Sequence, residues 1–331
     1  MNRFTRRLFY NVRRFWYGMM DPNSPSMWAF ALRHRKKVSR VPPDPLPAPP
    51  QTISEDPRSP RQEPVLQPSW PHVPRIIFQS WKSRTQIPSN FRTWSNSFKR
   101  YNPDYDCLVW DDHDNRDFIA EQFAWFLPFY DEYPKEIFRV DAVRFFFLYK
   151  FGGLYADMDT ECLKRLDPVL EAGDVIVGRM GADKTFEHSI PNAMMAAKPR
   201  HLLWLLAITM CMEKFKECST PEEMERRGPE TLTGPILLKT CVDTFNSTSE
   251  SEVRARASWV IDQVNLSDLP PLLAGNLEIL PPKLWYPVDW TNPFHRPFRQ
   301  TLADRRMVLT QEQTAKLFPD SYLVTYWSHS W

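Results

Sequence analysis

Residues Arg139–Thr160, which read RVDAVRFFFLYKFGGLYADMDT, decide how this chain folds. The first half predicts a helix, because Val140, Val143 and Phe147 recur at the i, i+3, i+7 spacing of one apolar face. The Gly-Gly pair that follows predicts the end of that helix, since glycine tolerates the left-handed backbone of a helix C-terminus. The stretch therefore predicts a helix that stops abruptly and passes directly into the next element.

That next element is a short apolar strand, Leu154–Ala156, with Asp157 and Asp159 at its far end. Side chains alternate along an extended chain, so residues i and i+2 lie on the same face. The two carboxylates are therefore expected to point the same way. Two hard oxygen ligands at a strand end suit Mg²⁺ or Mn²⁺.

Strands and helices alternate along most of the chain. The predicted strands are residues 76–78, 105–110, 154–157 and 175–177, and the predicted helices are 91–101, 115–127 closed by Pro128, 135–150 and 201–216. Weaker strand candidates follow at 277–280, 308–309 and 323–324. This alternation predicts an α/β fold, with a mostly parallel central sheet flanked by helices on both faces.

The N-terminal part of the chain differs in composition from the rest. Residues 41–74 are dense in proline, which is typical of an extended linker that builds no core. We therefore predict two parts: residues 1–70, a basic, Pro-rich and largely disordered extension, and residues 71–331, a single folded domain.

Charge and hydropathy limit the possible partners. Residues 1–40 hold ten Lys and Arg against one acid, so the rest of the 331-residue chain is slightly acidic, which argues against nucleic acid as the main partner. The basic segment is either an amphipathic helix lying on an anionic membrane or a disordered tail.

The apolar run Leu202–Met212 is too short to span a bilayer and indicates a buried helix. No C-x-x-C pair occurs among the five cysteines, so a zinc site is not expected.

Two charged residues precede the carboxylates by one helix. Asp141 and Arg144 are three positions apart and share a helix face. They form either a surface ion pair or part of a site in which Asp141 holds sugar hydroxyls and Arg144 a diphosphate or the sugar. In open α/β sheets ligands bind beyond the carboxyl ends of the strands, where Asp157 is expected to lie. A divalent cation there can neutralise a nucleotide diphosphate.

The whole stretch resembles the DXD region of glycosyltransferase family 32, which includes fungal α-1,6-mannosyltransferases and inositol phosphoceramide mannosyltransferases. The segments Pro74–Lys82 and Tyr105–Trp110 are similar to the first two strands of that family, and the resemblance covers roughly residues 72–245. One departure is Phe78, where the family often has His, so Phe78 is expected to have no polar role.

The resemblance implies a GT-A-like, single Rossmann-type domain that uses a nucleotide-sugar donor, either GDP-mannose or a UDP-sugar, with Mn²⁺ or Mg²⁺, and retains the anomeric configuration. Trp81 would lie near the base or the sugar. By the resemblance the catalytic residues are Asp141, Arg144, Asp157 and Asp159, the donor-binding residues are Trp81, Asp141, Arg144 and Asp157, and the metal ligands are Asp157, Asp159 and His329.

Three further positions have two interpretations each. His329 is either a metal ligand or an exposed residue near the end of the chain. Thr233-Gly234-Pro235 resembles a family turn near the acceptor, and is otherwise an ordinary loop. Asn192 either faces the donor sugar or is a turn residue. No nucleophile is predicted, since front-face retaining transfer lets the leaving diphosphate take the acceptor proton.

Two other functions remain possible at this point. Asp157-Met158-Asp159-Thr160 also fits the D-x-D-x-T signature of haloacid-dehalogenase phosphatases, in which Asp157 would be the nucleophile. That class needs a late acidic pair, and neither Gly-Asp-x-x-x-Asp nor Asp-Asp occurs after residue 160. The other possibility is a non-catalytic sugar-binding module, which would not need all four charged residues.

The acceptor and the cellular compartment are predicted only as broad classes. The acceptor is a glycan, a lipid or a small natural product, and the last would make this a tailoring enzyme of secondary metabolism. The composition of residues 1–40 favours a cytoplasmic or peripherally membrane-attached protein. The alternative is the Golgi lumen, which the glycosylation sequons at Asn246 and Asn265 support.

Overall fold

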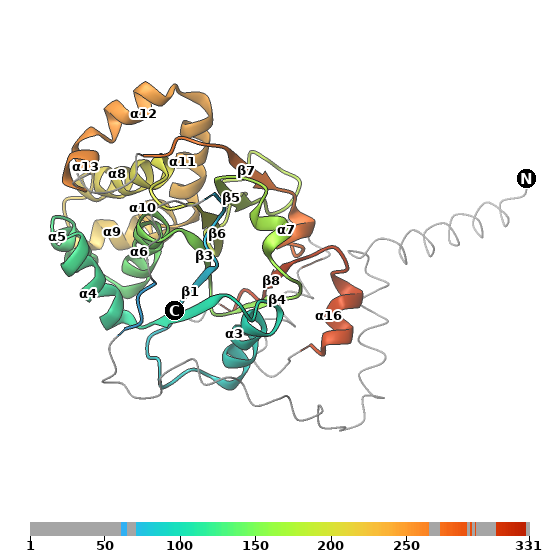
Figure 1. Ribbon diagram of the computed structural model, residues 1–331. Coiled ribbons are helices and arrows are strands. Elements are labelled where there is room, and N and C mark those ends of the chain that lie inside the picture. The colour runs from blue at the N-terminus through green and yellow to red at the C-terminus, as the bar shows by residue number, and fades with distance from the viewer. Residues whose placement is uncertain are drawn as a thin grey trace, which may run out of the picture.

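The computed structural model describes residues 61–64, 71–264, 272–289, 292, 295 and 309–328. Within these residues a six-stranded sheet has the strand order β2-β1-β3-β6-β5-β7 (Figure 1). Its strands are β1 (Ile76–Ser80), β2 (Asp106–Trp110), β3 (Gly153–Ala156), β5 (Val175–Gly178), β6 (Met194–Ala197) and β7 (Leu277–Leu280). Three of the five pairings are parallel and the two made by β6 are antiparallel. The predicted α/β class with a mostly parallel sheet is confirmed.

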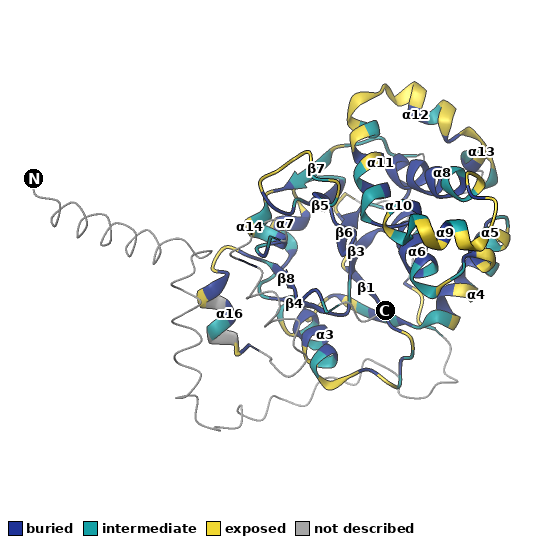
Figure 2. Ribbon diagram, turned by 180° about the vertical axis from the view of Figure 1, so that it is seen from behind, coloured by how far each residue is buried: buried dark blue, intermediate teal, exposed yellow. Residues whose placement is uncertain are grey.

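Side chains alternate between the two faces of this sheet. Met195 and Ala197 of β6 belong to the core under α6 (Glu136–Lys150) and α8 (Leu202–Lys216), whereas Met194 and Ala196 belong to the core on the opposite face. The opposite face is covered by α3 (Ser89–Tyr101), α7 (Asp167–Leu170) and α14 (Pro282–Trp285). Figure 2 shows the strands buried between these layers.

Strand β6 was not predicted from the sequence. Its residues Met-Met-Ala-Ala contain no β-branched or aromatic side chain, and all four are buried, so no alternation of apolar and polar residues marks them. Only the two strands on either side make this segment a strand.

The run Leu202–Met212 is the buried part of α8, as expected, and packs on α6. No helix among the described residues is both long and apolar enough to cross a bilayer. Pro128 was expected to close a helix, which is wrong. The chain forms α4 (Asp112–Gln122) and then α5 (Leu127–Glu132), and Pro128 lies in the first turn of α5, where a missing N–H leaves no hydrogen bond unmade.

Between α8 and β7 the chain forms helices that had not been predicted, α9 (Pro221–Arg227), α10 (Pro229–Leu232), α11 (Pro235–Ser247), α12 (Glu250–Arg256) and α13 (Ser258–Gln263). A second, two-stranded sheet pairs β4 (Thr160–Cys162) with β8 (Leu323–Thr325), and α16 (Gln311–Leu317) precedes β8. The β4–β8 pairing brings the C-terminal part of the chain beside the turn that contains Asp157 and Asp159.

Four residues of the predicted extension, 61–64, are described, and they contact the domain. The carbonyl oxygen of Gln62 accepts a hydrogen bond from Trp110 Nε1 at 2.9 Å, and the Arg61 guanidinium lies 5.4 Å from the Trp110 ring centre and pairs with Glu121. Residues 1–60 and 65–70 lie outside the described part of the chain. The boundary near residue 70 therefore stays a prediction, and any truncation test should keep residues from Arg61 onward.

Candidate functional site

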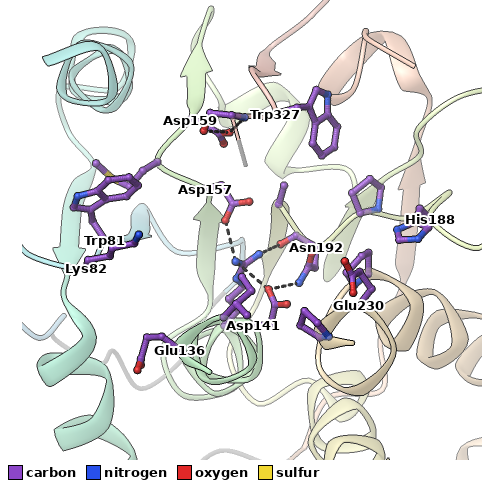
Figure 3. A pocket seen from close by; sticks show the side chains of 18 of the residues that line it. Trp81, Lys82, Glu136, Asp141, Asp157, Asp159, His188, Asn192, Glu230 and Trp327 are labelled. Atoms are coloured by element: carbon purple, nitrogen blue, oxygen red, sulfur yellow. Dashed lines mark hydrogen bonds and ion pairs between the residues drawn. The ribbon is translucent and has the colours of Figure 1, made fainter. Parts of the chain in front are cut away.

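A cavity of about 500 Å³ opens at the carboxyl ends of β1 and β3. Figure 3 shows its lining, which includes Asp141, Asp157, Asp159 and Trp81. These four come from a helix, the end of a strand, a turn and a loop. Four of the predicted site residues therefore surround one space, and Arg144, the fifth, lies in its wall.

The turn between α6 and β3 sets the position of Asp157. Gly152 and Gly153 have φ of 66° and 86°, in the left-handed region that glycine adopts without strain. A Cβ on Gly153 would lie 2.5 Å from the carbonyl oxygen of Ile76, and one on Gly152 would lie 2.6 Å from that of Ala197. The two glycines therefore let β3 lie between β1 and β6 directly after the helix, and this brings Asp157 next to the residues of α6.

Arg144 is buried and links three parts of the site. Its Nη2 lies 3.0 Å from Asp141 Oδ1 and 3.1 Å from Asp157 Oδ1, and its Nη1 donates to the carbonyl oxygen of Asn192 at 2.9 Å. The guanidinium also lies over the Tyr155 ring, 4.7 Å from its centre. A surface ion pair between Asp141 and Arg144 is therefore excluded. Arg144 is a fixed internal cation that positions two carboxylates.

The same burial changes the proton affinity of both carboxylates. Burial raises the pKa of Asp157 to about 7; Arg144 opposes the rise, while Asp159 and Asp141 add to it. Burial also raises the pKa of Asp141, against the effects of Arg144 and of the hydrogen bond from Asn192. A carboxyl pKa near 7 means that protons compete with a cation for Asp157 in neutral solution.

Asp159 is held from a different direction. Its Oδ2 accepts hydrogen bonds from the backbone N–H of Ser328 at 2.7 Å and from the Ser328 hydroxyl at 2.9 Å, while Oδ1 lies 3.4 Å from Thr325 Oγ1. Thr160 N donates to the carbonyl oxygen of Asp157 at 3.0 Å, so Asp159 lies in a turn that begins directly after Asp157. Both carboxylates do line one cavity, as expected, but the expected reason, a shared face of an extended strand, is wrong.

The two carboxylates fit a divalent cation of the Mg²⁺ or Mn²⁺ kind. Within the described residues there is no group of three or more His, Cys, Asp or Glu side chains that could hold a metal ion. Mg²⁺ is commonly bound by only one or two carboxylates, with water and substrate phosphates as the other ligands. Among the described residues, the two polar partners of the Asp157 carboxylate, Arg144 and Tyr155, both contact Oδ1, so Oδ2 takes part in neither contact. His329 lies outside the described residues, and its role stays a prediction.

Residues 88–176 match the sequence model of a family described as the glycosyltransferase sugar-binding region containing DXD motif. Over these residues the chain is similar to the DXD-containing glycosyltransferases. Asp141, Arg144, Asp157 and Asp159 all fall within this range, and the resemblance inferred from the sequence is confirmed.

Several named proteins are similar to part of this chain. Inositol phosphoceramide mannosyltransferase 2 of Schizosaccharomyces pombe is 35% identical over 167 residues, 44% of this chain and 48% of that protein. Inositol phosphoceramide mannosyltransferase 3 of the same yeast is 45% identical over 98 residues, 30% of this chain and 27% of that protein. The initiation-specific alpha-1,6-mannosyltransferase of Saccharomyces cerevisiae is 30% identical over 102 residues, 29% of this chain and 21% of that protein. The match therefore spans less than half the length of each of these relatives.

Among solved structures, a chain described as PaToxG Glycosyltransferase is similar with a TM-score of 0.39 and 15% sequence identity. The similarity covers 77% of this chain and 91% of that chain.

Phe78 lies in β1 and Trp81 directly follows that strand, just before the matched region. The Trp81 indole donates to the carbonyl oxygen of Gln86 at 3.1 Å and packs on Phe91 with 4.7 Å between ring centres, so its orientation is fixed before any ligand arrives. Phe78 is fully buried and stacks on Phe147, with 5.1 Å between ring centres, in line with the expectation that it has no polar role.

The structure shows the contacts of Asn192, for which the sequence gave two interpretations. Its side-chain Nδ2 donates to Asp141 Oδ1 at 2.9 Å while its backbone oxygen accepts from Arg144. It lies in the turn before β6, so it is a turn residue, and its buried side chain also contacts Asp141. Gly234 precedes α11, and a Cβ there would lie 3.0 Å from Asp141 Oδ2, so the Thr-Gly-Pro segment packs directly beside the site.

Several lining residues had no signal in the sequence: Lys82, Glu136, His188, Glu230, Trp327 and Ser328. Of these, Lys82 ends the segment Pro74–Lys82, and Trp327 and Ser328 directly precede His329, so the resemblance pointed to their segments but not to these three residues. The others come from loops or helix ends without a motif, and only the tertiary structure places them around the same cavity.

Proposed function

We propose that this protein is a metal-dependent, retaining glycosyltransferase that moves a hexose from a nucleotide-sugar donor to a hydroxyl group of an acceptor. The observation that carries this proposal is the convergence of Asp141, Asp157 and Asp159, with Arg144 fixed behind them, on one cavity at the carboxyl end of the sheet. The names of the three relatives described above, each a mannosyltransferase, support mannose as the sugar.

Each residue then has a role that its surroundings permit. Asp157 and Asp159 would hold Mn²⁺ or Mg²⁺, which when bound supplies positive charge to the diphosphate. Asp141, kept in place by Arg144 and Asn192, accepts hydrogen bonds from the donor sugar. The part of the Trp81 ring that lines the cavity supports the base or the sugar. No side chain is assigned as a nucleophile, and the departing diphosphate oxygen takes the acceptor proton.

The side of the cavity beside Trp81 favours GDP-mannose over a UDP-sugar as the donor. Glu136 lines this side, and Arg139 holds its Oε2 at 2.9 Å, which orients the carboxylate. Asp112 feels the charges of both Glu136 and Lys82, so these two lie on the same side of the site. Guanine offers two neighbouring N–H donors to a carboxylate, whereas uracil offers one N–H between two carbonyl oxygens, which a carboxylate repels.

Donor hydrolysis tests the proposal without knowledge of the acceptor. Purified protein is incubated with GDP-mannose, UDP-glucose and UDP-N-acetylglucosamine, with Mn²⁺ or with excess EDTA, and the released sugar is measured. We expect Mn²⁺-dependent release that is fastest from GDP-mannose. Hydrolysis of none of the donors, or equal rates with EDTA, would overturn the proposal.

The Glu136→Gln variant tests the choice of base. Losing one charged hydrogen bond to guanine should lower the preference for GDP-mannose over UDP-glucose about tenfold. Glu171, which is exposed and does not line the cavity, provides the matched control Glu171→Gln. An unchanged preference in Glu136→Gln would remove Glu136 from base recognition and leave the rest of the proposal standing.

For the compartment we keep the proposal of a cytoplasmic or peripherally membrane-attached protein, with membrane contact through residues 1–40 and the Golgi lumen as the alternative. Asn246 is exposed near the end of α11, and Asn265 lies outside the described residues. Protein from its own cells should show no mobility shift after glycosidase treatment. A shift that disappears when both asparagines are changed to Gln would place the domain in the secretory lumen.

A further inference from the structure

The cavity has two chemically different sides. Figure 3 shows Trp81 and Lys82 on one side of Asp157 and Asp141, and His188 and Glu230 on the other. The first side combines an aromatic ring with a cation, which suits a base and phosphates. The second side also has the Trp327 indole above it, and its labelled charged group is the carboxylate of Glu230. Its walls include Pro191, Pro229 and Pro235, which stiffen the backbone around it.

Glu230 is the charged group that defines the second side. It is exposed at the rim of the cavity, and the described residues offer it no hydrogen bond or ion pair. Lys135, another lining residue, is already paired with Glu225 at 2.7 Å. The carboxylate of Glu230 is close enough to Asp141 to raise the pKa of that group. Two negative charges therefore face this side without a free cation among the described lining residues there, and a phosphate group would be repelled.

Two glycines bring Glu230 to this place. Gly228 has φ of 82°, and a Cβ there would lie 2.7 Å from Glu230 Oε2, so the side chain occupies space that only glycine leaves open. A Cβ on Gly234 would lie 2.9 Å from Glu230 Cα and 3.0 Å from Asp141 Oδ2. Helix α10, which contains Glu230, therefore packs closely beside Asp141, and both carboxylates line the same cavity.

We infer that Glu230 is a specificity-determining residue for the acceptor and binds hydroxyl groups of a neutral polyol ring, a sugar or a cyclitol. A carboxylate accepts two hydrogen bonds from neighbouring hydroxyls, while its charge excludes an anionic group from the same position. The inference rests on the proposed function, since it needs Asp141 and the DXD side to hold the donor. Any phosphate or lipid attached to the acceptor would have to extend out of the cavity.

Two measurements on the whole protein test this. Binding of myo-inositol and of methyl α-mannoside is followed by saturation-transfer NMR in the presence of GDP and Mn²⁺, and donor hydrolysis is measured on the same samples. In Glu230→Gln the dissociation constants for the polyols should rise about ten- to a hundredfold, while the rate of donor hydrolysis stays within about twofold. Glu230→Asp, which keeps the charge, should recover part of the affinity.

The matched control is Glu222→Gln, an exposed glutamate on the neighbouring helix α9 that does not line the cavity and should change neither reading. Unchanged polyol affinity in Glu230→Gln would overturn the inference, as would a wild-type protein that binds neither polyol. A parallel loss of donor hydrolysis would assign Glu230 to the donor and overturn it too. Absence of hydrolysis in the wild-type protein would instead contradict the proposed function, and the polyol affinities would still be measured separately.

Discussion

Asp157 and Asp159 stand two residues apart in one motif, yet two different regions of the molecule hold them. Asp157 is held by α6 through Arg144, and by Tyr155 from its own strand, whose hydroxyl donates to Oδ1 at 3.0 Å. Asp159 is held by the C-terminal segment after β8, through Ser328. The first support lies within the same short stretch of sequence, and the second lies 169 residues away. Asp157 is therefore positioned by residues close to it in sequence, whereas Asp159 is positioned by a contact with the segment that follows β8.

The largest effect is expected from removing the support of Asp157. Arg144→Ala leaves Asp141 and Asp157 as buried carboxylates without their cation, which should cost about 3–5 kcal/mol of unfolding free energy. The measurement is chemical denaturation at pH 8. The control is Arg116→Ala, which breaks an exposed ion pair with Asp131 and should cost about 1 kcal/mol or less. Equal losses in the two variants would show that Arg144 does not hold the site together.

Removing either carboxylate should act on activity rather than on the fold. Asp159→Ala and Asp157→Ala should each lower donor hydrolysis by about 10²–10³-fold, because each removes one ligand of the cation that stabilises the diphosphate. Circular dichroism checks that the fold persists. Turnover in Asp159→Ala equal to that of the wild-type protein would separate the DXD motif from the chemistry.

The pH dependence of stability distinguishes the two carboxylates further. The pKa of Asp157 is about 7 in the folded protein, above its ordinary value of 3.8, so between these values the folded state binds more protons than the unfolded state. Stability without metal should therefore fall as pH rises from about 4 to about 7. Asp157→Asn should remove this loss, and at pH 8 the variant should be more stable than the metal-free wild-type protein, on the order of 2 kcal/mol.

Thermal melts from pH 4.5 to pH 8 with EDTA measure this difference, and Mn²⁺ should raise the melting temperature of the wild-type protein only. A variant that is less stable than the wild-type protein at pH 8 would mean that the pairing with Arg144 outweighs the burial of the carboxylate.

The smallest effect on activity is expected from removing the hydroxyl group that contacts Asp159. Ser328→Ala removes the hydroxyl contact with Asp159 and keeps the backbone N–H contact, so it should weaken Mn²⁺ activation about fivefold, or about 1 kcal/mol. Titration of donor hydrolysis with Mn²⁺ gives the value. Thr248→Ala, at an exposed position at the end of α11, is the control. A loss of donor hydrolysis as large as that of Asp159→Ala would show that Ser328 does more than position the Asp159 carboxylate.

The sequence predicted the α/β class, the helix–glycine–strand stretch and the shared face of Asp141 and Arg144. It did not predict β6, whose four residues carry no strand pattern and become a strand only between β3 and β5. It also assigned Pro128 to the end of a helix instead of the beginning, because proline marks a helix boundary without saying on which side the helix lies. The roles of the predicted site residues stay predictions until they are measured.

What the sequence determined by itself is the part of the site whose contacts are close along the chain. The helix period, the two left-handed glycines and the strand that follows fix Asp141, Arg144 and Asp157 relative to one another within about one helix and one strand, because local backbone geometry leaves few alternatives. Only the tertiary structure decided that Asn192 bonds to Asp141, that Ser328 holds Asp159, and that Glu230 stands across the cavity. These contacts join segments whose separation in sequence carries no periodic signal, so they follow from packing of the whole core and not from any local pattern.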